Sequence, residues 1–404
     1  MNTVVNMDGS EIVQEENVGK RAVNYSAGSV RSDVSKQWIN RPADERFLTL
    51  ADLADAKGLE RSNSEAYAIA NKQVTLLAPE VRTLDDTNKL STKVFGRGDE
   101  FGMTPWAFNQ IAGLVKAPSK YLRSLPSQIV ADNLNWGLQR NRAVEEIKPL
   151  LTGTENGPVL RAVTGPNYGR IWDHEVVKAV QGIADQGHWK VPGVMDWGTG
   201  IYDPDAPITS ETTTLFASDR DVFIFLVDDK RPIIVGELPD GSPDYMFRGF
   251  WVSNSEVGLK SFSVAAMYLR SICCNRILWG VEGFQEVSIR HSSGAPSRFA
   301  EEIRPALESY AEKSDAKLIE AVADAKAATV AKDDEEALEF LRGRDFSRSN
   351  AQAIFDLHEK EEGRPIRSAW DAAQGITAFA RDIPNSDNRL RVEANAGRIL
   401  NKVA

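Results

Sequence analysis

The residues between Trp189 and His291 form a series of strand-like runs separated by short turns. Two of these turns, Ser218–Asp221 and Asn254–Gly258, are short enough to join neighbouring strands as hairpins, which predicts mainly antiparallel pairing. One run, Val222–Val227, is apolar at every position, so we expect it to be buried on both faces of a sheet. The predicted strands are Trp189–Val191, Thr213–Ala217, Val222–Val227, Ile233–Val235, Phe247–Ser253, Lys260–Leu269 and Glu286–His291.

Helical patterns precede and follow this strand series. Asp173 can cap a helix that ends at Gly187, and Thr104 can cap another that begins with Pro105. The C-terminal residues have an almost purely helical pattern, with helices predicted at Phe299–Val330, Asn350–Glu362, Ser368–Arg381 and Arg389–Val403. The predicted fold class is therefore α+β: a mixed, mainly antiparallel sheet with a packed helix, followed by an all-helical C-terminal region.

A length of 404 residues predicts two or three domains. Residues 1–40 are polar and are interpreted as a flexible leader. Residues 41–157 form an N-terminal mixed and helical region, 158–300 the α+β core and 301–404 the helical C-terminal region. A strand expected at Val159–Val163 opens the core.

Cations and aromatic residues alternate through Phe247–Phe299, the most distinctive stretch of the core. A surface for single-stranded nucleic acid needs both, because cations hold phosphates and aromatic rings stack on bases. Many half-buried sheets have the same composition, so a purely structural interpretation stands beside the functional one. The candidate nucleic-acid-binding residues are Lys260, Arg270, Arg276, Arg290, Arg298, Trp251 and Tyr268, together with Arg170 from the segment YGRIW.

The net charge is −10, which argues against general attraction to nucleic acid. Residues 101–150, however, contain six Lys and Arg residues and only three Asp and Glu residues. A locally cationic surface on an acidic protein is compatible with a nucleic-acid site, although solvated charge explains the imbalance equally well. The cations that would extend such a track are Lys116, Lys120, Arg123, Arg140 and Arg142.

No catalytic, metal or cofactor site is predicted. The four histidines lack metal-ligand spacing, and no phosphate-binding glycine loop or nucleophile motif is present. One alternative stays open, a two-metal nuclease site whose carboxylates come from several elements: Asp219, Asp221, Glu237 and Asp244. The two cysteines are adjacent and no long apolar run occurs, so we expect a cytoplasmic protein with no membrane contact.

Several segments resemble the phage- and plasmid-like proteins that carry the domain of unknown function 932. The resemblance extends from about Trp38 to the C-terminus and implies a mobile-element context, without implying an activity or site residues. The predicted core is also compatible, by analogy of fold alone, with the single-strand-annealing recombinase superfamily. The segments include RAVTGPNYGRIWDHEVVKAV, KVPGVMDWGTGIYDPD, LFASDRDVFIFLVDD, FRGFWVSNSEVG, NRILWGVEGFQEVSIRHSSGAPSRFA, GMTPWAFNQIAGLVKAPSKYLRSLP and WDAAQGITAFARDIP.

The favoured functional hypothesis is a DNA-binding protein of a mobile element. It would bind single-stranded DNA as a homo-oligomer and promote annealing or recombination without ATP, which fits the missing nucleotide loop. The second hypothesis is a counter-defence or interaction protein that binds a host protein, which the negative charge favours. The third is the metal-dependent nuclease.

Overall fold

The structure is a computed structural model of the chain. It describes residues 4–5, 11–12, 22–25, 41–80, 84–94, 100–140, 145–196, 201–237, 241–270, 276–277, 286–311, 316–381, 383 and 386–402. The chain divides into two compact units: unit 1 consists of Met1–Arg31 and Gly58–Tyr168, and unit 2 of Ser32–Lys57 and Gly169–Ala404. The segment Gly58–Tyr168 of unit 1 is thus inserted in the chain of unit 2, and the boundary at its start falls inside helix α1 (Leu50–Ser62).

The sheet of unit 1 contains eight described strands in the order β3-β8-β9-β11-β10-β5, with β6 paired to β10 and β7 to β8. The pair β9–β11 is parallel and the others are antiparallel. The strands are β3 (Val23–Asn24), β5 (Ser64–Ala66), β6 (Ile69–Ala70), β7 (Val74–Leu77), β8 (Lys89–Val94), β9 (Glu100–Met103), β10 (Glu146–Thr154) and β11 (Gly157–Thr164); β1 (Val4–Val5) and β2 (Glu11–Ile12) pair separately.

Three helices of unit 1 pack on this sheet: α2 (Pro105–Leu114), α3 (Ser119–Leu122) and α4 (Ser127–Arg140). Thr104 is the N-cap of α2, as the sequence predicts, and its hydroxyl accepts the backbone N–H of Ala107 at 3.1 Å. Part of the predicted leader also packs here. Tyr25 is 2% exposed and stacks on Phe108, and burial raises the pKa of its phenol to about 12.

Two glycines of these helices give opposite predictions. Gly113 of α2 has open space where a Cβ would stand, so Gly113→Ala is expected to stabilise the helix by about 0.5–1 kcal/mol. A Cβ at Gly137 of α4 would lie 2.6 Å from the Cβ of Val115, so Gly137→Ala is expected to destabilise unit 1 by roughly 1–3 kcal/mol. Amide hydrogen exchange of α2 and α4 measures both effects, and equal protection changes in the two variants would contradict the close approach.

The sheet of unit 2 has the order β18-β17-β16-β15-β14-β4 among its described strands, with β19 also paired to β17, and every pair is antiparallel. Its centre consists of three long strands: β15 (Val222–Glu237), β16 (Pro243–Asn254) and β17 (Phe262–Arg270). The remaining strands are β4 (Arg46–Phe47), β14 (Leu215–Ala217), β18 (Arg276–Ile277) and β19 (Glu286–Ile289); β12 (Val194–Asp196) and β13 (Ile201–Asp203) form a separate pair.

The central strands are buried on both faces, as predicted for Val222–Val227. Ile224 and Leu226 belong to one core, whereas Phe223, Phe225 and Val227 belong to another. Side chains alternate between the two faces of a strand, so a continuously apolar run supplies both cores.

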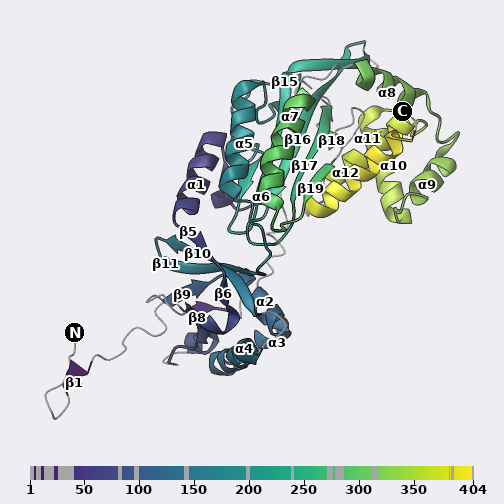
Figure 1. The fold of residues 1–404 in the computed structure, drawn as a ribbon. Helices are drawn as coiled ribbons and strands as arrows, with labels where there is room; N and C mark the ends of the chain where they lie inside the picture. Colours follow the sequence, from purple (N-terminus) through teal and green to yellow (C-terminus); the bar gives the residue numbers. More distant parts are fainter. Residues whose placement is uncertain are drawn as a thin grey trace. The chain divides into compact units, whose positions relative to one another are not determined.

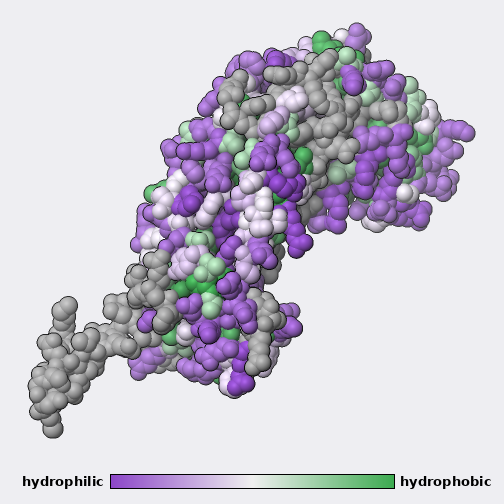
Figure 2. Space-filling model, viewed as in Figure 1, coloured by the Kyte–Doolittle hydropathy of each residue, from purple (hydrophilic) through white to green (hydrophobic). Residues whose placement is uncertain are grey.

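Helices cover the first of these faces and one end of the sheet (Figure 1). The covering helices are α5 (Asp173–Gln186), α6 (Ala295–Arg298), the π-helical turn η4 (Phe299–Ile303) and α7 (Arg304–Ala311). The C-terminal helices enclose a core of their own and present a largely hydrophilic outer surface (Figure 2). They are α8 (Ala316–Ala327), α9 (Asp334–Arg342), α10 (Arg348–Glu362), α11 (Ala369–Arg381) and α12 (Ser386–Leu400).

The α+β class with a helical C-terminal region is confirmed, while several element boundaries differ from the prediction. Two predicted strands merge into β15, whose pairing with β16 shifts register between Asp228 and Ile233. The long helix expected from Phe299 begins as the π-helical turn η4 and continues as α7 and α8, between which residues 312–315 lie outside the described residues; α9 was not predicted. The cap of α5 is Trp172 rather than Asp173, because the Asp173 carboxylate accepts a hydrogen bond from Asn254 instead.

Candidate nucleic-acid interface

Arg270, predicted to bind phosphate, lies in a buried ion cluster of unit 2. Its guanidinium donates to both oxygens of Asp244, at 2.8 and 3.1 Å, and also to Glu362 of α10. Lys326 of α8 lies 3.4 Å from the same Asp244 carboxylate. The side chain of Arg270 is 3% exposed, so in this conformation it ties the C-terminal helices to the sheet.

The two predicted stacking residues are also buried. Trp251 is 4% exposed and stacks on Phe223, with ring centroids 5.9 Å apart. Tyr268 is 1% exposed and belongs to the core of the C-terminal helices. Neither ring presents a face to solvent, so stacking on a base would require the surrounding core to open.

Arg170 is 8% exposed and donates to the carbonyl of Glu256, while its guanidinium lies over the Trp172 ring. These contacts match the structural interpretation of the segment YGRIW, in which it packs at the entry of α5. The neighbouring His291 contacts the carbonyl of Gly169 through Nδ1 at 3.1 Å, and burial lowers the pKa of its imidazole.

Lys260 belongs to a second ion cluster, at the β14–β15 hairpin. Its ammonium lies 3.1 Å from Asp221, whose carboxylate also receives two hydrogen bonds from Arg41 and one from Ser218. Burial alone would raise the pKa of Asp221, but the charges of Arg41 and Lys260 and the Ser218 hydroxyl more than offset this, and the pKa lies below its usual range. Glu45 shows the opposite shift, because burial raises the pKa of its carboxyl group.

Arg290 and Arg298 are the predicted cations whose side chains are exposed in unit 2. Arg298 forms a two-bond ion pair with Glu302, at 2.9 and 3.0 Å, which raises the pKa of Arg298 and lowers that of Glu302. The backbone of Arg276 lies in β18, whereas its side chain is outside the described residues, as are Cys273 and Cys274.

The four carboxylates of the nuclease alternative are not brought together. Asp221 lies beside the end of β16 at Asn254, and Asp244 lies near the other end of the same strand. A strand advances about 3.3 Å per residue, so these two carboxylates are separated by roughly 30 Å. Among the described residues, no group of three or more His, Cys, Asp and Glu side chains is arranged to hold a metal ion.

An exposed combination of cations and aromatic rings occurs instead on unit 1. Trp136 of α4 is 63% exposed, and the guanidinium carbon of Arg140 lies 3.9 Å from the centroid of its ring. Tyr121 of α3 is 61% exposed and Ile129 of α4 is 52% exposed. We call this surface the α3–α4 face and define it by Lys116, Lys120, Tyr121, Ile129, Trp136 and Arg140.

Helix geometry explains why Ile129, Trp136 and Arg140 share one side of α4, since they are spaced seven and four residues apart. The inner side of α4 carries Val130, Leu134 and Leu138, so Trp136 points away from the core at about 100° per residue. Gly137 allows α4 to approach Val115 closely, and Val115 and Gly137 are the chain neighbours of Lys116 and Trp136. The same periodicity identifies Trp136 as an outward-facing residue from the sequence, although the predicted cationic track contains no aromatic residue of this segment.

The α3–α4 face is cationic as well as aromatic. Residues 115–140 contain one exposed carboxylate, Asp132, and three exposed cations, which are Lys116, Lys120 and Arg140. Arg123 is instead held by Asn109 and lies over the Phe108 ring, so it stabilises unit 1. Arg142 lies outside the described residues.

The fold is that of an α+β protein with two compact units and a helical C-terminal region. Residues 204–383 match the family model described as "Domain of unknown function (DUF932)". All of the matched residues lie in unit 2, and the match confirms the predicted resemblance to DUF932 proteins over these residues. Comparison with curated proteins gave no match, and comparison with solved structures gave none either. Across the described residues, no helix has the length and apolar character needed to cross a membrane.

Proposed function

We propose that the protein binds single-stranded DNA through the α3–α4 face of unit 1 and promotes annealing without ATP. The observation that carries the proposal is the exposed Trp136 ring with Arg140 stacked on it. A tryptophan in water forgoes the free energy of burial, and its exposed ring is suited to stacking on a base. Every base has a π-face, so such a surface binds single strands with little sequence preference.

The cations of the face supply the second part of the interaction. Lys116, Lys120 and Arg140 are exposed and can contact phosphates. Neutralising three phosphates of a single strand gives a slope of about −2 in a plot of log affinity against log salt. The predicted contacts Arg290 and Arg298 of unit 2 remain a second candidate surface.

Annealing would follow from holding strands with part of each base accessible. Oligomerisation would extend such a surface across subunits, and the mobile-element context implied by the resemblance fits this activity. Pairing of complementary strands releases free energy by itself, which is consistent with the absence of a phosphate-binding loop motif from the sequence.

Fluorescence anisotropy of labelled single-stranded and double-stranded oligonucleotides across a salt series tests the proposal. We expect preferential binding of single strands, and a loss of about 5- to 150-fold in affinity for Trp136→Ala, because base–aromatic stacking is worth about 1–3 kcal/mol per base. Lys116→Glu with Lys120→Glu should weaken binding and flatten the salt dependence.

Matched controls are available in unit 2. Ile234 is a 54% exposed apolar side chain on β15, and Lys178 and Lys317 are exposed cations. Ile234→Ala and the pair Lys178→Glu with Lys317→Glu should leave affinity unchanged. Unchanged affinity in Trp136→Ala, with loss in Arg290→Glu, would move the interface to unit 2. No binding at low salt by the folded protein would refute DNA binding and favour a host protein partner.

A further inference from the structure

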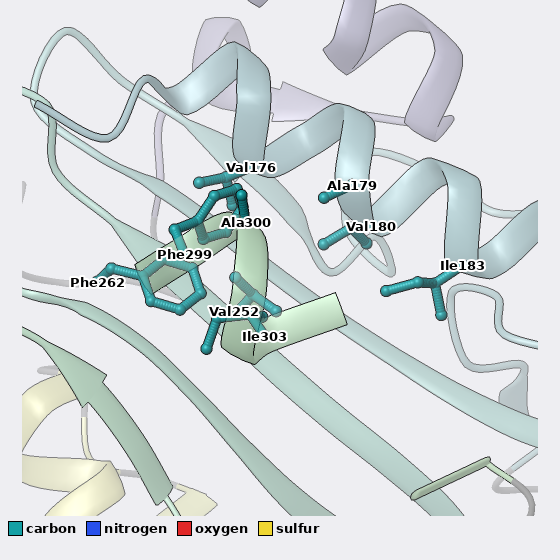
Figure 3. A pocket seen from close by; sticks show the side chains of 9 residues that line it. All are labelled: Val176, Ala179, Val180, Ile183, Val252, Phe262, Phe299, Ala300 and Ile303. Carbon is teal, nitrogen blue, oxygen red and sulfur yellow. The ribbon is translucent and has the colours of Figure 1, made fainter. Parts of the chain in front are cut away.

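An apolar cavity of about 250 Å³ lies in unit 2 between α5, the sheet and the π-helical turn η4 (Figure 3). The side of α5 from Val176 to Ile183 forms one wall. Val252 of β16 and Phe262 of β17 contribute from the sheet. The opposite wall comes from Phe299, Ala300 and Ile303 of η4, so the cavity separates two helical segments that cover the same face.

The local sequence accounts for the space. Small side chains at Ala179 of α5 and Ala300 of η4 line the cavity from its two helical walls and leave space between them. Ala300 is exposed, which places it on the open side of the cavity. A π-helical turn is rare, and such turns occur frequently at functional sites. Interiors normally contain few voids larger than a water molecule, so a space of this size is a candidate ligand site.

The lining determines what can bind. All nine lining side chains are apolar, and the described residues therefore offer a ligand no side-chain hydrogen-bond partner in the cavity. A buried N–H, O–H or charge on the ligand would lose its water without compensation. An apolar cavity of about 150 Å³ binds benzene, so the larger volume here has room for a second fused ring or an aliphatic chain of similar size.

We propose that this cavity binds an uncharged hydrocarbon group, either a bicyclic aromatic molecule or the apolar end of an acyl chain. The inference is independent of DNA binding, because it rests on the cavity of unit 2 alone. Ligand occupancy would hold α5 and η4 at their present separation and thereby stabilise unit 2.

Ligand-detected nuclear magnetic resonance and thermal unfolding with naphthalene, indole and octanoate test this inference on the full chain. We expect saturable naphthalene binding and a raised melting temperature, with weaker binding of indole because its N–H finds no partner. Octanoate tests whether the ligand is an acyl chain. Its hydrocarbon chain would enter the cavity while its carboxylate stays in solvent at the open side. Binding of either naphthalene or octanoate supports hydrocarbon binding by the cavity, and the one that binds shows whether the ligand is a bicyclic aromatic molecule or an acyl chain.

Two substitutions on α5 separate the cavity from nonspecific adsorption. Ala179→Phe fills the cavity and should abolish binding, whereas Lys178→Phe adds the same ring on the exposed side of the helix and should leave binding intact. Ala300→Trp, at the open side, provides a second blocking variant if Ala179→Phe does not fold. Failure of both naphthalene and octanoate to bind the folded protein, or unchanged binding in a folded blocking variant, would overturn the inference.

Discussion

Replacing Arg270 by methionine is expected to lower the free energy of unfolding of unit 2 by about 3–5 kcal/mol, because it leaves a buried carboxylate without its main counter-charge. Asp244 is 1% exposed and receives two hydrogen bonds from this guanidinium. Glu362 of α10 loses the same partner, so the C-terminal helices lose an anchor to the sheet. Urea denaturation, followed by far-ultraviolet circular dichroism, measures the change.

Arg298→Met is the matched control for this prediction. Arg298 also forms a two-bond pair with a carboxylate, but both side chains are about half exposed and water solvates Glu302 when the arginine is removed. We therefore expect little change in stability. Similar denaturation midpoints for Arg270→Met and the unsubstituted protein would show that the buried cluster does not anchor the helices.

Asp221→Asn is expected to destabilise unit 2 by a similar amount, about 3–5 kcal/mol, because two cations lose their shared counter-charge. The side chain of Arg41 is fully buried and that of Lys260 is 20% exposed, so water can compensate only the second. The exposed Asp219 in the same hairpin is the control, and Asp219→Asn should change stability by no more than about 0.5 kcal/mol.

The pH dependence gives this prediction a second measurement. The pKa of Asp221 is lower in the folded protein than its ordinary value, so its stabilising contribution is complete above that ordinary value and is lost as the pH falls toward the folded-state pKa. Asp221→Asn should therefore lose less stability than the unsubstituted protein when the pH falls below about 4. The raised pKa of Glu45 acts in the opposite sense, since ionising this buried carboxyl costs stability as the pH rises. Parallel pH profiles for the two proteins would contradict the assigned pairing.

The hairpins of unit 2 could be predicted because their signals are local. Turn residues and apolar runs within a few positions of each other define β14 to β17. The predicted strand at Val159–Val163 also exists, but it pairs with β9 and β10 in unit 1. Sheet membership depends on partners distant in the chain, which no local pattern specifies.

The candidate site was less predictable for the same reason. The residues next to a cation in a strand do not indicate its ion-pair partner. Arg270 pairs with Glu362, 92 positions later in the chain, and Lys260 pairs with Asp221. Spacing along the sequence therefore did not separate buried ion-paired cations from exposed ones. Trp136 was different, since the apolar positions of α4 were visible and imply that its ring faces solvent.

The insertion of Gly58–Tyr168 in the chain of unit 2 also sets an order of events during synthesis on the ribosome. The segment that carries Arg41 is made early, yet its partner Asp221 follows 180 residues later. At a synthesis rate of about 5–20 residues per second, Asp221 is added to the chain roughly 10–35 s after Arg41. The segment Gly58–Tyr168 lies between the two and completes unit 1, which can therefore fold in this interval, whereas the sheet of unit 2 cannot be completed until its end. The nascent chain must therefore keep the first strand of that sheet, β4, from pairing elsewhere until β14 emerges.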